Sequence, residues 1–242
     1  METISINAQG ERPSLSGRFG PFAARWSWWT ALLGPLAFGV WLISAAVAIA
    51  QFHSVAIPVQ FGLPAALLLG MFAAQQRWCF PDLRLTGDLR GGAVVSGIVI
   101  VTLLYLVDYG AALWMGQPRE PRMVRLYDGL TSAQIAVMLV SMPILAPIVE
   151  ELVFRHFLLS VLPFKKSGTI AGLAVVVTAA LFSLVHKSAY IFPTTFVLLF
   201  ALGVVFAVAR IRTDGVALPM GLHAYAIVFG LMCDQAMKFL KG

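Results

Sequence analysis

Two adjacent acids and an arginine follow a long uncharged segment of the chain. Glu150 and Glu151 come directly after residues 129–149, which contain no Asp, Glu, Lys or Arg, and Arg155 follows about one helical turn later. An ionisable side chain at bilayer depth costs about 2.5–3.5 kcal/mol on insertion scales, so a cluster there needs partners and usually serves a function. The cluster therefore indicates polar chemistry inside a membrane.

Helix geometry separates the two acids. Glu151 and Arg155 share a helix face because they are four residues apart, whereas Glu150 is turned away by about 100°. Glu151 can then pair with Arg155, which leaves Glu150 available for chemistry. Pro143 and Pro147 each remove a backbone hydrogen bond and bend the helix, which would open it just before the acids. The alternative is that both acids only neutralise the arginine or face a loop at the helix end.

Two histidines on later apolar segments are the other candidates for chemistry. His186 follows Phe182 by one turn, and a neutral imidazole at that depth can act as a base, a proton shuttle or a metal ligand. His223 follows a turn predicted at Asp214, and Gly221 is expected to let a neighbouring backbone approach it. Taken singly, each histidine is more typical of a hydrogen-bonded core residue than of a ligand.

A carboxylate with two histidines suits the hydrolysis of an amide bond, because these groups can polarise a water molecule and stabilise the oxyanion of a tetrahedral intermediate. The same three residues match a catalytic zinc site with an open position, although no His-Glu-x-x-His pair is present. A zinc-dependent and a metal-free glutamate mechanism are equally consistent with Glu150, His186 and His223. His156 lies about 240° around the helix from Glu150 and is not expected to be a ligand. His53 is assigned no role.

Taken as a set, these motifs resemble those of the CPBP family, the CAAX-type (Abi, type II CAAX prenyl endopeptidase) intramembrane proteases. The matching motifs are Glu-Glu-x-x-x-Arg at residues 150–155, Phe-x-x-x-His at residues 182–186, and a late histidine preceded by Thr-x-Gly at residues 213–215. The resemblance covers about residues 132–230. It implies a multi-helix membrane endopeptidase whose first motif glutamate activates water.

The resemblance also implies a role for each matched residue. Glu150 and His186 would activate water, and His223 would stabilise the oxyanion or bind a metal. The residues that would support the site are Glu151, Arg155 and Phe182.

One position departs from the family pattern. The fourth residue after His223 is usually Asn or another small polar residue, whereas this chain has Ile227. Tyr225 or the backbone would have to supply the lost donor. Removing one oxyanion donor typically lowers the rate about 10²- to 10³-fold, which weakens catalysis without abolishing it.

The elements that must position these side chains are predicted to be membrane-spanning helices. Of 242 residues, 60% are hydrophobic and 12% are charged, against roughly 25% charged in an ordinary soluble domain. The apolar runs are continuous rather than alternating, which favours helices over a closed barrel. The runs predict an all-α, multi-pass transmembrane bundle of about seven helices and leave an eighth open. They lie between residues 25 and 77, with a break near 51–54, and at 91–115, 129–149, 167–185, 188–209 and 215–233.

The domain organisation follows from the same composition. We expect residues 1–25 to form a disordered cytoplasmic tail and residues 26–242 to form a single transmembrane helical domain, with a protease-like core at about 132–230. With a cytoplasmic N-terminus, the connections on that side hold ten basic residues and those on the other side six, apart from Arg155 within the membrane. This predicts an integral protein of the plasma or inner membrane with its N-terminus in the cytoplasm.

Charge and composition also bound the partners. The net charge of +6 suits anionic lipid headgroups. Nucleic-acid binding is not predicted, because the sequence lacks a basic stripe interleaved with aromatic residues. The expected partners are the bilayer and a membrane-associated or lipid-modified protein or peptide, while the oligomeric state is not predicted.

A second class of function competes with hydrolysis. Asp108 interrupts the third apolar run beside Tyr105 and Tyr109, and intramembrane acids often mark ion paths, so a non-catalytic protein is the alternative, either a transport module or an inactive protease-like binder. The repeated halves typical of transporters are not apparent. A rhomboid-like serine protease is discounted because no Gly-x-Ser-Gly motif is present. The sequence therefore favours an intramembrane endopeptidase.

Overall fold

The computed structural model describes residues 27–51, 57–81 and 83–241, and the regular structure within them is entirely helical. Seven of the helices are long and apolar enough to cross a membrane. This confirms the predicted all-α, multi-pass fold, while the tail predicted at residues 1–25 and His53 lie outside the described residues. The long helices are α2 (Trp28–Gln51), α3 (Ile57–Trp78), α4 (Gly91–Trp114), α6 (Ser132–Glu151), α7 (Gly168–Val185), α8 (Pro193–Thr213) and α9 (Ala217–Lys241).

Short helical segments join or extend these spans. The one-turn helix α5 (Pro121–Val124) lies between α4 and α6, and η4 (His186–Ser188) follows α7. After α6 the chain continues as a π-helical segment, η2 (Leu152–Leu158), and then as a 3₁₀ turn, η3 (Leu159–Val161). The span that carries the two acids therefore runs on well beyond them, and the acids lie inside it rather than at its end.

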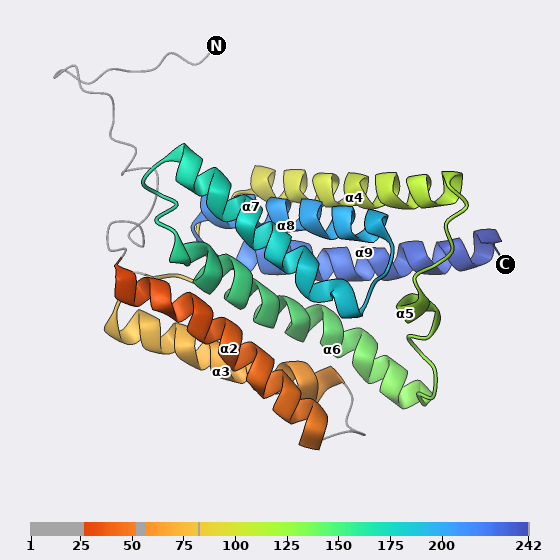
Figure 1. Ribbon diagram of the computed structural model, residues 1–242, viewed down its shortest axis with the longest axis horizontal. Helices are drawn as coiled ribbons and strands as arrows, with labels where there is room; N and C mark the ends of the chain where they lie inside the picture. The colour runs from red at the N-terminus through yellow and green to blue at the C-terminus, as the bar shows by residue number, and fades with distance from the viewer. Residues whose placement is uncertain (1–26, 52–56, 82, 242) are drawn as a thin grey trace, which may run out of the picture.

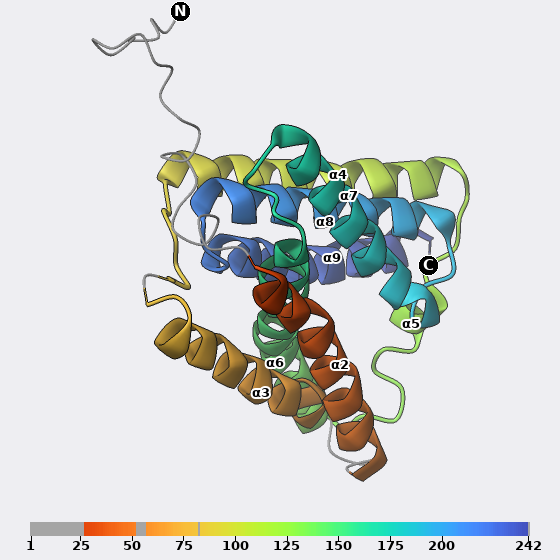
Figure 2. The ribbon, with the colours of Figure 1, turned by 60° about the vertical axis from the view of Figure 1, so that its left-hand side comes forward.

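The long helices form two groups (Figures 1 and 2). α2, α3 and the α6–η2 span pack together, while α4, α8 and α9 lie side by side, and α7 crosses α8. Contacts between α6 and α9 join the two groups. Each group has its own buried apolar cluster, one around Phe154 and Leu152 and the other around Phe206 and Leu222. The polar cluster lies where the two groups meet.

The outer surface suits a bilayer. On α4, Leu103, Leu106 and Val107 are more than half exposed, as expected of side chains that face lipid. Trp78 and Trp114 lie at helix ends and are also exposed, and tryptophan is typical of the interface between lipid and water. The chain is thus an integral, multi-pass membrane protein.

Candidate active site

The two acids face different surroundings although they are adjacent on α6. The helix begins at a capping box in which Thr131 and Gln134 satisfy each other's backbone groups, and it remains helical through Pro143 and Pro147 up to Glu151. The departure from α geometry comes directly afterwards, in η2. A π-helical turn widens the helix, so the side chains that follow it are shifted around the axis relative to a continuous α-helix.

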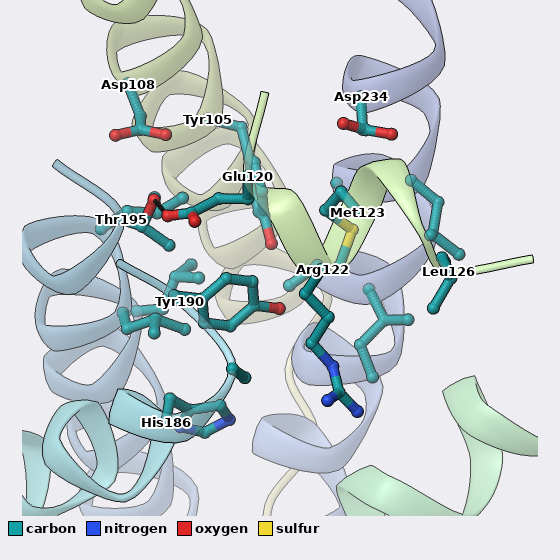
Figure 3. A pocket seen from close by; sticks show the side chains of 18 of the residues that line it. Tyr105, Asp108, Glu120, Arg122, Met123, Leu126, His186, Tyr190, Thr195 and Asp234 are labelled. Carbon is teal, nitrogen blue, oxygen red and sulfur yellow. Dashed lines mark hydrogen bonds between the residues drawn. The ribbon is translucent and has the colours of Figure 1, made fainter. Parts of the chain in front are cut away.

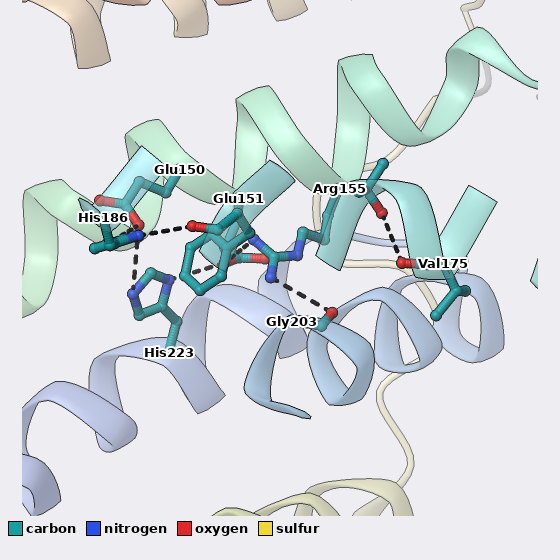
Figure 4. A network of polar contacts seen from close by, with 9 residues as sticks. Glu150, Glu151, Arg155, Val175, His186, Gly203 and His223 are labelled. Carbon is teal, nitrogen blue, oxygen red and sulfur yellow. Dashed lines mark hydrogen bonds and ion pairs between the residues drawn. The ribbon is translucent and has the colours of Figure 1, made fainter. Parts of the chain in front are cut away.

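Glu151 belongs to a fully buried ion pair (Figure 4). Its Oε1 atom lies 3.1 Å from Nη1 of Arg155, and both side chains have no exposed surface. The pairing one turn apart is the one predicted from helix geometry. A second guanidinium nitrogen, Nη2, donates to the carbonyl oxygen of Gly203 on α8 at 3.5 Å. The pair therefore ties the α6–η2 span to α8.

Aromatic rings enclose the arginine. The guanidinium group lies over the ring of Phe182, 4.3 Å from its centroid, and 5.2 Å from the centroid of Phe206. A cation over an aromatic face is stabilised by the quadrupole of the ring, and more strongly where water is excluded. Phe182 also contacts the rings of His186 and His223, so it is packed at the centre of the cluster. This arrangement suits the supporting role that the family resemblance implies for Phe182.

A glycine allows the helices behind this ring to approach closely. A Cβ atom on Gly203 would lie 2.9 Å from the Cα atom of Ala179, so any larger residue would push α8 away from α7. The predicted role of Gly221 is wrong, because the space beside it is open and the residue is exposed. Close approach therefore supports the site at Gly203 on α8 and not at Gly221.

His223 on α9 joins the buried pair to the second glutamate. Its Nδ1 atom lies 2.8 Å from Oε1 of Glu151, and its ring stacks on Phe206 with the centroids 5.2 Å apart. Because a carboxylate only accepts hydrogen bonds, Nδ1 carries the proton. The other ring nitrogen, Nε2, faces Oε2 of Glu150 at 3.8 Å.

His186, directly after α7, is fixed in the same way. Its Nδ1 atom donates to the carbonyl oxygen of Phe182 at 2.7 Å, and its Nε2 atom lies 3.9 Å from Oε2 of Glu150. The ring is half-buried and stacks near Tyr190. In the neutral form, each histidine thus turns an unprotonated nitrogen toward the carboxylate.

The convergence of Glu150, His186 and His223 is the central feature of the site. Three groups that can each accept a proton face one another, and Oε2 of Glu150 is buried without a hydrogen-bond partner among the described residues. Burying an acceptor without a hydrogen-bond partner costs free energy, so a molecule that donates a hydrogen bond to Oε2 would bind well here. Water has this property, and its oxygen would then lie beside a general base.

A cavity of about 320 Å³ adjoins these three residues. Its walls come from α3, α4, α5, α6, α7, α8 and α9, and Figure 3 shows the end that lies toward α5. Glu151 and Arg155 do not line it. The cavity is large enough for part of a peptide, and Glu150 is the one of the two adjacent acids that lines it.

The fit of a metal ion to these side chains is incomplete. Within the described part of the chain, no three His, Cys, Asp or Glu side chains converge closely enough for a metal site. Ligands at 2.0–2.1 Å in a tetrahedral zinc site are about 3.4 Å apart. The two nitrogens lie 3.8 and 3.9 Å from the glutamate oxygen, so zinc would require the side chains to move together. In their present positions, the three side chains fit a reaction carried by the side chains alone better than one at a zinc ion.

Other residues considered from the sequence lie outside the cluster. His156 is buried with Nε2 at 2.6 Å from Oε1 of Gln75 and does not line the cavity. The proposal that Tyr225 supplies a donor is wrong, because its hydroxyl pairs with Thr102 at 2.6 Å, away from the cavity. Ile227 does line the cavity, so an apolar side chain stands where the family usually has a polar one.

Sequence reasoning missed the segment around α5. Glu120 accepts hydrogen bonds from the backbone of Ile191 and Phe192 and from the hydroxyl of Thr195, and so caps the start of α8. Arg119 donates to Asp234 on α9 at 2.9 Å, a hydrogen bond that raises the pKa of the arginine. Nothing in the composition of this short polar connection distinguishes it from an ordinary loop.

Comparison with known proteins points to one family. The family model for type II CAAX prenyl endopeptidases, Rce1-like, matches residues 132–229. An uncharacterized 24.3 kDa protein of Escherichia coli is 32% identical over 165 residues, which cover 68% of this chain and 75% of that protein. The membrane-embedded CAAX protease MroQ of Staphylococcus aureus (strain USA300) is 25% identical over 147 residues, 58% of this chain and 55% of MroQ. No solved structure matches.

Proposed function

The chain belongs to the Rce1-like family of type II CAAX prenyl endopeptidases, and we propose on this basis that it hydrolyses peptide bonds within the membrane, with Glu150 as the general base. The observation that carries the proposal is the Oε2 atom of this glutamate, which has no hydrogen-bond partner in the part of the chain that the structure describes and faces two histidine nitrogens at a cavity wall. A protease of this family is expected to act on membrane proteins.

The reaction follows from the hydrogen-bonding capacity of the three side chains. A water molecule donates one hydrogen to Glu150 and the other to Nε2 of His186, which orients its lone pair toward the substrate carbonyl. As the oxygen–carbon bond forms, the proton passes to Glu150. It is then delivered to the leaving amine as the carbon–nitrogen bond breaks.

His223 assists at the developing oxyanion. When the ring takes up a second proton from solvent, this proton lies on Nε2, which then donates to the oxyanion while Nδ1 continues to donate to Glu151. Glu151 therefore sets the tautomer and orientation of the ring, much as the aspartate of a catalytic triad does. Arg155 and Phe182 hold this glutamate in position.

The substrate is proposed to be a membrane-associated or lipid-modified protein. The cavity is walled by transmembrane helices, and its lining mixes apolar groups such as Met142 and Leu231 with the charged groups near α5. No feature of the lining identifies a pocket for a prenyl chain. The excess of basic residues in the connections on the N-terminal side supports a plasma or inner membrane location with a cytoplasmic N-terminus.

The alternative is a non-catalytic member of the family that binds membrane proteins. Ile227 favours it, because an apolar side chain there removes one donor from the cavity. Asp108 also lines the cavity, but the repeated halves that would support a transport module are not apparent in the sequence.

The test compares protein termini in membranes from cells that express the parent chain or Glu150→Gln, matched for expression and for thermal stability in detergent. Termini that appear with the parent and vanish with the variant are the expected result. Identical termini in several host backgrounds, with both proteins folded, would favour the non-catalytic alternative.

A chelator distinguishes the two forms of the mechanism. A side-chain mechanism predicts that cleavage by purified protein survives dialysis against 1,10-phenanthroline. Loss of cleavage that zinc restores would instead make Glu150, His186 and His223 the ligands of a metal.

A further inference from the structure

The cavity contains an arginine that the proposed chemistry does not use. Arg122 lies on α5 and lines the same cavity as Glu150 and His186. Figure 3 shows its side chain extending from α5 to about the level of His186, with Tyr190 beside it in the view. In residues 27–51, 57–81 and 83–241, no carboxylate forms an ion pair with it.

Two of the acids that line the cavity with Arg122 are already engaged. The carboxylate of Glu120 accepts three hydrogen bonds at the start of α8, at 2.7–3.1 Å. The carboxylate of Asp234 pairs with Arg119. Neither acid is therefore available to neutralise Arg122, although both line the cavity with it.

Tyr190 does not offset the charge either. Burial raises the pKa of this phenol to about 12, even though the positive charge of Arg122 acts in the opposite direction. Near neutral pH the phenol is therefore uncharged. The phenol therefore contributes no negative charge that would offset the guanidinium of Arg122.

The backbone that carries Arg122 is held at two points. Glu120 fastens it to the start of α8, and Arg119 fastens it to α9. Pro121 begins α5 and fixes its own backbone angle. The arginine is thus presented to the cavity from an ordered segment, which lowers the entropy lost when it binds a partner.

We propose that Arg122 binds a carboxylate of the peptide substrate and so makes an anionic group near the scissile bond a determinant of specificity. This inference rests on the proposed endopeptidase function. A guanidinium group matches a carboxylate with two parallel hydrogen bonds. Because Arg122 and Glu150 line one cavity of about 320 Å³, the carboxylate lies within a few residues of the bond that is cut. It is either the C-terminal carboxylate or an Asp or Glu side chain.

The experiment measures the binding of three N-palmitoylated pentapeptides of alanine and valine in detergent. The first has a free C-terminal carboxylate, the second a C-terminal amide, and the third an amide with Asp as its penultimate residue. Affinities are measured by microscale thermophoresis with the full chain carrying Glu150→Gln, which prevents turnover. The same chain is then tested with Arg122→Gln, Arg122→Lys or the control Arg125→Gln, which alters an exposed arginine three residues away that does not line the cavity.

A carboxylate peptide is expected to bind about 10- to 100-fold more tightly than the plain amide, in line with hydrogen bonds between charged groups. Arg122→Gln should remove this preference, Arg122→Lys should restore part of it, and Arg125→Gln should leave it unchanged. Preference for the first peptide identifies the C-terminus as the bound group, and preference for the third identifies a side chain. Equal affinity for all three, including no binding of any, overturns the proposal, as does an equal effect of Arg125→Gln.

Cleavage of the same peptides by the chain with Glu150 intact is scored separately by mass spectrometry. Binding that depends on Arg122 without any cleavage contradicts the endopeptidase function and keeps the anion site. Cleavage with equal affinity for the three peptides contradicts the anion site and keeps the function.

Discussion

Glu150 and Glu151 are adjacent on one helix, yet they belong to two different regions of the molecule. Glu151 lies in a buried region in which Arg155, His223 and aromatic rings surround it. Glu150 lies at the cavity wall with an oxygen that has no hydrogen-bond partner among the described residues. The same residue type therefore serves as a structural anion at Glu151 and as a candidate base at Glu150. Surroundings rather than residue type decide the role.

His223 belongs to both regions. One ring nitrogen contacts Glu151 and the other faces Glu150. The buried region thus orients a group that lines the cavity. His186, by contrast, depends on the carbonyl of Phe182 and is half-buried. This division between the buried region and the cavity wall can be tested with variants whose free energy of unfolding and cleavage rate are both measured.

The largest expected effect is on stability, at Arg155. Arg155→Met leaves Glu151 as a buried charge without its ion-pair partner, and breaking such a pair costs about 3–5 kcal/mol. The free energy of unfolding, measured in detergent by titration with SDS, should show this loss. Glu151→Gln/Arg155→Met removes both charges and should recover most of it. A double variant as unstable as Arg155→Met would show that the arginine stabilises the fold by packing and not by pairing.

A smaller effect is expected at the two histidines, and it should divide between rate and stability. His186→Gln and His223→Gln should each lower the cleavage rate about 10²- to 10³-fold, because each removes one group that acts on water or on the oxyanion. Only His223→Gln should also lower the free energy of unfolding, by about 1–3 kcal/mol, because it removes a buried hydrogen bond to Glu151. Cleavage rates and unfolding curves measured on the same samples check this. Equal destabilisation by both variants would remove the distinction between the regions.

The smallest effect is expected at Ile227. Ile227→Asn adds a donor at the cavity wall and should raise the cleavage rate about tenfold, less than the 10²- to 10³-fold that loss of an established donor costs. Ile227→Val, which shortens the side chain without adding a donor, serves as the control. An increase with both variants would indicate that space, and not hydrogen bonding, limits the reaction.

The helices and the main contacts of the site were predictable from the sequence. Long apolar runs without alternation satisfy their backbone groups in lipid as helices and not as a barrel, which explains why the seven spans could be predicted. Charged residues at bilayer depth need partners, so the pairing of Glu151 with Arg155 followed from their spacing. The separate position of Glu150 followed from the same geometry.

Other features depend on contacts between distant segments and leave no local pattern. The π-helical segment η2 begins directly after Glu151 and packs mainly against α2, and no residue pattern in the sequence predicts its change of helix geometry. The close approach of α7 and α8 at Gly203 was not anticipated, and Gly221 was assigned that role wrongly. Tyr225 shares its helix with His223, but its hydroxyl meets Thr102 on α4. Only the packing of whole helices reveals such pairings.

The most direct test of the division between the two acids is the cleavage rate per folded molecule of Glu150→Gln and Glu151→Gln. The substrate is one recovered from the comparison of termini, and the folded fraction is measured in the same samples. We predict that Glu150→Gln stays folded and loses about 10²- to 10⁴-fold in rate, whereas Glu151→Gln loses stability and retains the larger share of its rate per folded molecule. A folded Glu150→Gln protein that cleaves at the parental rate would contradict the account.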